Sequence, residues 1–117
     1  PYAGKWDKSG HLPDTVVQQM GDLGLLGLQV PSEWGGFKTD DLAYALCIEE
    51  VAAGCASSAV LMSVHSSVGC VPILKFGSQE QKQRFLQPLA SGAMLGAFAH
   101  FCHASASAFD DSFGTLN

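Results

Sequence analysis

The 117-residue sequence predicts an all-α domain of about four helices, because three kinds of signal recur along it. Apolar residues fall three and four positions apart, which places them on one face of a helix. Acidic or hydroxyl residues stand just before these segments, as helix N-caps do, and glycines follow them, as at helix ends. Hydrophobic residues make up 47% of the chain and charged residues 15%, which excludes a disordered polyelectrolyte.

The first 36 residues are expected to contain one helix. Residues 1–12 are polar and Gly-rich and are expected to form a loop or a frayed end. A helix is expected to begin at Asp14, which can cap free N–H groups, and to end at Gly24. An apolar turn or short extended piece is expected over residues 25–30, and the paired glycines predict a loop at residues 33–36.

Two helices are expected in the middle of the chain. Asp40-Asp41 place two acids at the positive end of a second helix, which Gly54 closes. A third helix, at residues 56–71, is small or apolar on most sides, a pattern typical of a buried helix. Pro72 is expected to disrupt its end.

A fourth helix is expected after the run Ser78-Gln79-Glu80-Gln81, which has the pattern of a capping box. It continues as far as Pro88. The short apolar run at residues 94–99 predicts a strand, although the sequence offers it no partner strand.

Charge and cysteine content exclude several classes of protein. Six basic residues against 11 acidic ones give a net charge of −5, which argues against nucleic-acid binding. No uninterrupted apolar run reaches about 18 residues, so no transmembrane helix is expected. The four cysteines form no C-x-x-C pair, which favours a reducing compartment without a disulfide framework. The mean hydropathy is nevertheless positive, which predicts apolar surface intended for a partner.

Other chemical motifs are weak. His100, Cys102 and His103 are metal-ligand types placed close together, but zinc needs four ligands and no second cluster is evident. No metal site is therefore predicted, and a metal-binding tail stays a minor alternative. Glu49 and Glu50 point about 100° apart on a helix, so they do not share a site.

Three segments carry a resemblance to a known family: MGDLGLLGLQVPSEWGG at residues 20–36, LAYALCIEEVAAGCASSAVLMSVHSSVG at residues 42–69 and PILKFGSQEQKQRFLQPLASGAMLGAFA at residues 72–99. In order and spacing they resemble the N-terminal helical domain of FAD-dependent acyl-CoA dehydrogenases, closest to the short-chain type. The resemblance implies oxidation of the Cα–Cβ bond of an acyl thioester by a glutamate base and a flavin. It also implies that this base lies in a C-terminal domain that the 117 residues do not contain.

The resemblance gives a meaning to one stripe of the third expected helix. Leu61, Val64, His65 and Val68 fall at helical spacing on one face. The family implies that this helix lines the pocket for the acyl tail, which makes these four residues substrate-binding candidates. Ordinary core packing is the alternative, and for His65 a packing role is favoured over that of a base.

The resemblance ends near residue 99. It implies flavin contacts at Phe98, Ala99, His100 and Phe101, but the Glu-Pro, Gly and Ser-Asp of the family segment that follows are absent. We therefore expect a family domain at residues 1–99 and an irregular, non-family tail at residues 100–117.

The sequence as a whole predicts the N-terminal domain of a short-chain acyl-CoA dehydrogenase, from a bacterial cytoplasm or a mitochondrial matrix. FAD and acyl-CoA are expected for the complete enzyme, whereas this chain is expected to bind no flavin and to be inactive. A homo-oligomer through exposed apolar faces is expected, with no nucleic acid or membrane partner. The alternative is a non-catalytic helical module for self-association or interaction.

Overall fold

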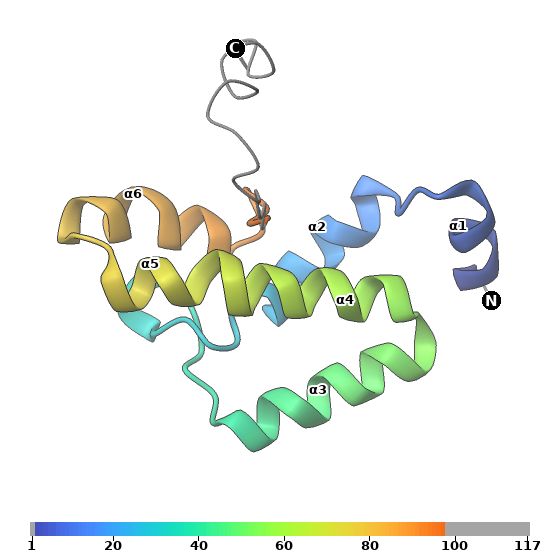
Figure 1. Ribbon diagram of the computed structural model, residues 1–117, viewed down its shortest axis with the longest axis horizontal. Coiled ribbons are helices and arrows are strands. Elements are labelled where there is room, and N and C mark those ends of the chain that lie inside the picture. The colour runs from blue at the N-terminus through green and yellow to red at the C-terminus, as the bar shows by residue number, and fades with distance from the viewer. Residues whose placement is uncertain (1, 98–117) are drawn as a thin grey trace, which may run out of the picture.

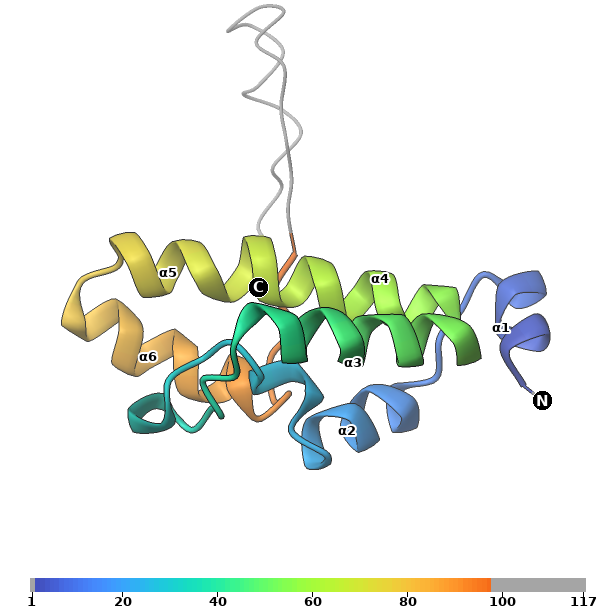
Figure 2. The same ribbon diagram turned by 90° about the horizontal axis from the view of Figure 1, so that it is seen from below.

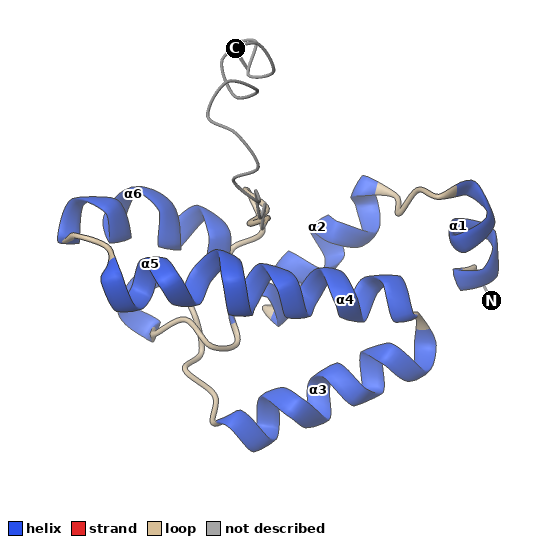
Figure 3. Cartoon of the chain, in the orientation of Figure 1, coloured by secondary structure: helices blue, strands red, loops and turns tan. Residues whose placement is uncertain are grey.

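The computed structural model describes residues 2–97, and within this range the chain is all helical with no strand (Figures 1 and 3). The predicted all-α class is confirmed. The α-helices are α1 (Ala3–Ser9), α2 (Asp14–Asp22), α3 (Asp41–Gly54), α4 (Ala56–Val64), α5 (Val71–Phe76) and α6 (Gln79–Ala90). Two short 3₁₀ turns, η1 (Leu25–Gly27) and η2 (Ser32–Trp34), and one π-helical segment, η3 (His65–Cys70), complete the set.

One long helix crosses the molecule. α4, η3 and α5 follow one another without a break from Ala56 to Phe76 (Figure 1). α3 lies alongside α4, and α6 folds back along α5 (Figures 1 and 2). α1 lies near the N-terminal end of α4. α2 is followed by the short turns η1 and η2 (Figure 2). The long helix therefore contacts most of the other elements.

Two hydrophobic clusters hold these elements together. The first joins Met62 of α4 to Met20, Leu26 and Leu28, and the inner face of α3 packs against it. The second joins Cys70 to residues of α6 and to the η1–η2 region: Val30, Leu86, Leu89 and Ala90. Because the long helix contributes to both clusters, it fixes α3 relative to α6.

Local capping explains where two helices begin. The Asp40 carboxylate accepts a hydrogen bond from the Ala43 backbone N–H (2.8 Å), so α3 starts at the predicted acidic pair. The capping box predicted for α6 is confirmed, since Ser78 and Gln81 exchange both side-chain-to-backbone bonds, at 2.9 and 3.2 Å. Gly24 ends the α2 region with a left-handed φ of 75°, a conformation that glycine adopts without strain.

The expectation of a loop at residues 1–12 is wrong, because α1 occupies Ala3–Ser9. Tyr2 and Trp6, one helical turn apart, stack with ring centroids 6.3 Å apart, and the Lys5 ammonium lies over the Tyr2 ring. Gly10 then adopts a left-handed φ of 64° and ends the helix. Contacts between aromatic side chains four residues apart thus stabilise a short helix whose composition is polar.

The expectation that Pro72 ends the third helix is also wrong. The chain continues helically to Phe76, and Pro72 is the second residue of α5, which follows the π-helical segment η3. A π-helical insertion loosens the hydrogen-bond ladder at the point where proline has no N–H to contribute. Pro88 is likewise accommodated inside α6, which ends at Ala90.

The predicted strand at residues 94–99 is not formed in its described part, residues 94–97, which has no regular secondary structure. Its first residue is held by a backbone bond from the Met94 N–H to the Pro88 carbonyl (3.0 Å). The segment crosses a helix and meets no strand edge, so no β ladder can form.

The long helix Ala56–Phe76 meets the length and mean composition required to cross a membrane, although serines and a histidine interrupt its apolar residues. The central helix of a globular domain meets the same requirement. Ser58, His65 and Ser66 of this helix are buried against other parts of the domain. We therefore describe it as the centre of the helical domain.

Candidate functional site: an apolar groove beside the central helix

An open apolar groove of 380 Å³ lies between α4 and the segment that follows α6. The α4 residues that line it are spaced three and four apart, which places them on one helix face. The opposite wall comes from residues 95–97. The full lining consists of Ser57, Val60, Leu61, Val64, Leu95, Gly96 and Ala97.

The groove is open to solvent and apolar. Val60 is 61% exposed and Leu95 48% exposed, so an apolar ligand would remove surface of both side chains from water. Burial of such surface is favourable by about 25 cal/mol per Å². The site therefore suits an apolar chain, and its one polar side chain is that of Ser57.

The structure separates the four predicted substrate-binding residues into two groups. Leu61 and Val64 line the groove, whereas His65 and Val68 do not line it. His65 instead belongs to the buried side of the long helix, together with Ser58 and Met62. The groove face continues toward the N-terminus of α4, to Val60 and Ser57.

His65 lies beneath the groove with its ring 1% exposed. Nδ1 accepts a hydrogen bond from the Gly96 N–H (3.0 Å), and Nε2 lies 3.1 Å from the Leu89 carbonyl oxygen. A backbone N–H can only donate and a carbonyl can only accept, so the ring is neutral and carries its proton on Nε2. Burial lowers the pKa of His65 below 6.5, which is consistent with a neutral ring.

Cys70 completes the surroundings of the imidazole. Its Sγ lies 3.5 Å from Nε2 of His65, because the π-helical segment brings residues five apart onto one face. Burial raises the pKa of the Cys70 thiol to about 11, so it stays protonated. The imidazole is therefore held among neutral groups in the apolar interior.

The predicted cofactor-binding residues Phe98, Ala99, His100 and Phe101 lie outside the described residues, as do the histidines and the cysteine of the weak metal motif. Within residues 2–97, no group of three or more His, Cys, Asp or Glu side chains could hold a metal ion. The buried side-chain polar atoms without a partner in this range belong to three different elements: Trp34 Nε1, Tyr44 OH and Ser66 Oγ. No step involving a flavin is assigned to these residues.

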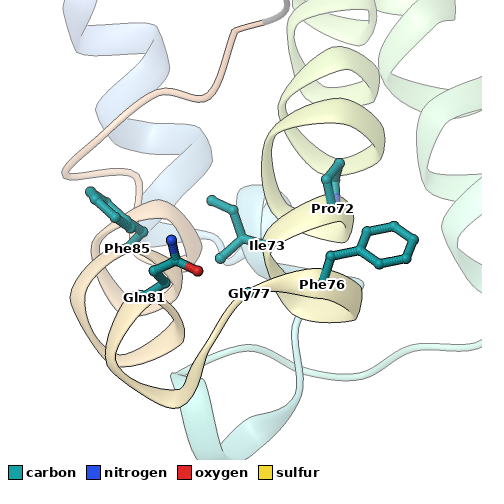
Figure 4. A pocket seen from close by; sticks show the side chains of 6 residues that line it. All are labelled: Pro72, Ile73, Phe76, Gly77, Gln81 and Phe85. Carbon is teal, nitrogen blue, oxygen red and sulfur yellow. The ribbon is translucent and has the colours of Figure 1, made fainter.

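A second apolar cavity, of 410 Å³, lies between α5 and α6. Figure 4 shows Phe76 and Phe85 on its two sides, with the Gln81 amide between them. Pro72, Ile73 and Gly77 complete its lining. It shares no lining residue with the groove and includes none of the residues predicted to bind substrate.

Cysteine chemistry within the described residues is limited. Cys47, Cys55 and Cys70 are free thiols. Hydrogen bonding by the Ser58 side chain and backbone lowers the pKa of Cys55, which is the N-cap of α4.

Sequence reasoning missed Val60 and the wall formed by residues 95–97. Val60 stands four residues before Val64, so the helical stripe could have been extended by one turn toward the N-terminus. The glycine at position 96 was a signal of close backbone approach. A Cβ built there would lie 2.8 Å from the Gly69 Cα, so only glycine fits at this crossing.

Comparison with known proteins assigns the family. The family model described as acyl-CoA dehydrogenase, N-terminal domain, matches residues 1–93. The human mitochondrial short-chain specific acyl-CoA dehydrogenase is 50% identical over 99 residues, which cover 85% of this chain and 24% of that protein. An acyl-CoA dehydrogenase of Bacillus subtilis is 43% identical over 99 residues, with coverages of 85% and 26%. This chain therefore belongs to the acyl-CoA dehydrogenase family and corresponds to its N-terminal domain.

Solved structures agree with this assignment. Butyryl-CoA dehydrogenase from Megasphaera elsdenii matches with a TM-score of 0.73 and 32% identity, over 81% of this chain and 26% of that chain. Glutaryl-CoA dehydrogenase from Mycobacterium smegmatis, solved in complex with FADH2, matches with a TM-score of 0.76 and 32% identity, over 81% and 24%. The chain spans about a quarter of the length of the curated relatives it matches.

Proposed function

We propose that this chain is the part of a short-chain acyl-CoA dehydrogenase that contributes one wall of the acyl-chain site, and that the groove beside α4 receives the acyl tail. The observation that carries the proposal is the apolar lining formed by Val60, Leu61, Val64 and Leu95. Leu61 and Val64 keep their proposed substrate role. His65 and Val68 do not line the groove, so no direct contact with the acyl tail is proposed for them.

The preference for a short acyl chain is supported by the relatives. Several are short-chain specific acyl-CoA dehydrogenases, at 44–50% identity, and a butyryl-CoA dehydrogenase shares the fold. A complete enzyme of this family would dehydrogenate the acyl thioester with FAD. We propose that this 117-residue chain alone does not, since the family resemblance assigns the glutamate base to a region that these residues do not include.

Binding to the groove can be tested by NMR with methyl-labelled protein. Addition of butyryl-CoA is expected to shift the methyl signals of Leu61, Val64 and Leu95, while free CoA leaves them unchanged. A Val64→Trp variant, which fills the groove, is expected to lose these shifts. Leu42→Trp is the matched control, because Leu42 is 71% exposed on α3 and does not line the groove. Equal shifts with butyryl-CoA and with free CoA would count against an acyl site.

The proposed lack of flavin binding has a separate test. The purified chain is mixed with FAD, passed through a desalting column and examined by visible absorbance. We expect no retained flavin. Retention of one FAD per chain would overturn this part of the proposal. It would support the hypothesis that the flavin is bound by Phe98, Ala99, His100 and Phe101.

We further propose that the family domain covers residues 1–99 and that residues 100–117 form a separate tail. The family model, which matches residues 1–93, supports this boundary. The mitochondrial and bacterial relatives fit a mitochondrial matrix or a bacterial cytoplasm for this protein. Limited proteolysis followed by mass spectrometry is expected to cut first within residues 100–117.

A second candidate function, self-association, has one specific observation in its favour. Leu42 and Leu46 lie one helical turn apart on α3 and are 71% and 53% exposed, while the opposite face of α3 packs against the core. We propose that this face pairs with another apolar surface. Light scattering after size-exclusion chromatography should show association that Leu46→Glu removes and Gln83→Glu, at an exposed position of α6, retains. A monomer at every concentration would exclude it.

A further inference from the structure

The imidazole of His65 links three parts of the domain that are distant in sequence. It belongs to the long helix, its Nε2 lies 3.1 Å from the Leu89 oxygen in α6, and its Nδ1 accepts from Gly96. These partners lie 24 and 31 residues further along the chain. The ring is almost fully buried, so water cannot substitute for either hydrogen bond.

The contact with Gly96 fixes a segment that has no regular secondary structure. Residues 94–97 belong to no helix or strand, so no regular hydrogen-bond ladder holds them in place. Two backbone N–H groups hold this segment, Met94 to the Pro88 carbonyl and Gly96 to the His65 ring, each at 3.0 Å. The second of these bonds lies at the groove wall itself.

The backbone of this segment rests directly on the backbone of the long helix. A Cβ added to Gly69 would lie 3.0 Å from the Gly96 Cα, closer than ordinary side chains approach. Two glycines thus meet where the segment crosses η3. The His65 hydrogen bond holds Gly96 in this contact, because the ring and Gly69 are on the same π-helical segment.

Leu95, Gly96 and Ala97 form one wall of the groove, and Val60, Leu61 and Val64 form the other. The separation of the two walls therefore depends on where Gly96 sits. We propose that His65 is a positioning residue that sets the separation of the two groove walls through its hydrogen bond to Gly96, and thereby how tightly the groove holds an acyl chain. This inference rests on the proposed function of the groove.

The proposed positioning of Gly96 requires a neutral His65 imidazole. Nδ1 can accept from Gly96 only while it carries no proton. The titratable group in contact with the ring is Cys70, which is itself neutral. The Leu89 carbonyl on α6 accepts a hydrogen bond from Nε2–H, so the interior favours the tautomer whose Nδ1 can accept from Gly96.

The test compares His65→Asn with His65→Phe in the full 117-residue chain. The Asn Oδ1 lies near the position of Nδ1 and can accept from Gly96, whereas Phe fills the space without any hydrogen bond. Hydrogen exchange of the Gly96 amide reports the bond. Titrations with butyryl-CoA and with free CoA report how much the acyl chain contributes to binding.

For His65→Phe we expect Gly96 amide exchange to accelerate by about tenfold or more, as loss of one hydrogen bond implies. The ratio of free-CoA to butyryl-CoA dissociation constants should fall, because the two walls no longer hold the acyl chain between them. His65→Asn should restore both values toward those of the wild type. A purely structural role of His65 would change stability but would leave this ratio unchanged.

The outcomes separate the two proposals. Wild-type binding of butyryl-CoA with an unchanged ratio in His65→Phe would overturn the positioning role alone. Failure of butyryl-CoA to bind the wild type more tightly than free CoA would overturn the acyl site and the positioning role with it, while the exchange of Gly96 would still report the hydrogen bond. If His65→Phe does not fold, ¹⁵N NMR of the wild type decides: a protonated Nδ1, or no coupling between Nδ1 and the Gly96 amide, overturns the inference.

Discussion

Replacing Gly69 by alanine tests the close crossing that shapes the groove. The new Cβ would lie 3.0 Å from the Gly96 Cα, and ordinary van der Waals contact begins at 3.4 Å. The segment must therefore move away by about 0.4 Å. This movement would stretch the 3.0 Å bond from the Gly96 N–H to His65 Nδ1 beyond the usual range of about 2.7–3.2 Å.

Two opposing effects decide the size of the change. Forcing an extra methyl group into a packed site costs about 1–3 kcal/mol. Replacing glycine by alanine in a helix returns up to about 1 kcal/mol. Gly54→Ala is a suitable control, because nothing lies within 4 Å of its new Cβ and it too is a helical residue with an ordinary φ. We expect Gly69→Ala to be less stable than Gly54→Ala by about 1–3 kcal/mol.

Urea unfolding followed by circular dichroism measures the difference directly. Similar slopes for the two variants would show that their unfolded states are comparable, so that the midpoints report stability. A Gly69→Ala variant as stable as Gly54→Ala would refute the close crossing of the two glycine backbones. It would also show that contact with Gly69 does not fix the distance between Gly96 and the long helix.

Three further predictions concern pH, a helix cap and the core. Burial lowers the pKa of His65 below 6.5, so the unfolded chain binds a proton that the folded chain does not. The free energy of unfolding should therefore decrease as the pH falls below 6.5, by at most about 1.4 kcal/mol per pH unit, and His65→Asn should remove this slope in urea titrations. Ser78→Ala removes the acceptor for the Gln81 N–H and should cost about 1 kcal/mol in thermal unfolding, whereas Ser67→Ala at an exposed position should cost less. Met62→Ala, at a fully buried position, should cost about 2–5 kcal/mol in urea unfolding.

The helix ends that could be predicted are those encoded by neighbouring residues. Asp40 reaches the N–H of Ala43, and Ser78 reaches that of Gln81, each three residues away. A short sequence window contains both partners of such a bond, so the pattern alone indicates the helix start. The acyl-CoA dehydrogenase family could likewise be identified, because its segments occur in order and at the right spacing.

The continuity of the long helix could not be predicted in the same way. Pro72 predicts a break locally, yet the helix continues past it, after the π-helical segment η3. The first residue of that segment, His65, makes contacts 24 and 31 positions away. Such distant partners lie outside any local window, and tertiary contacts override local propensity at this point.

The candidate site was predicted in part for the same reason. A period of 3.6 residues groups Leu61 with Val64, and both line the groove from the regular helix α4. His65 falls at the same spacing but is buried, and its partners Leu89 and Gly96 lie far along the chain. The second wall of the groove was interpreted as a strand, since an apolar run with a glycine does not show that its partner is a helix backbone.

Part of the apolar excess of the composition lies on two separate surfaces. In the groove, the Val60 and Leu95 side chains are exposed on facing walls. On α3, Leu42 and Leu46 are exposed on the side away from the core. The groove is concave and its walls are tied together by a buried hydrogen bond, as a ligand site requires, whereas the α3 surface is one face of a helix, as in helix pairing. We therefore propose the groove as a site for a small molecule and the α3 face as a site for a protein surface, and the two proposals can be tested by different variants.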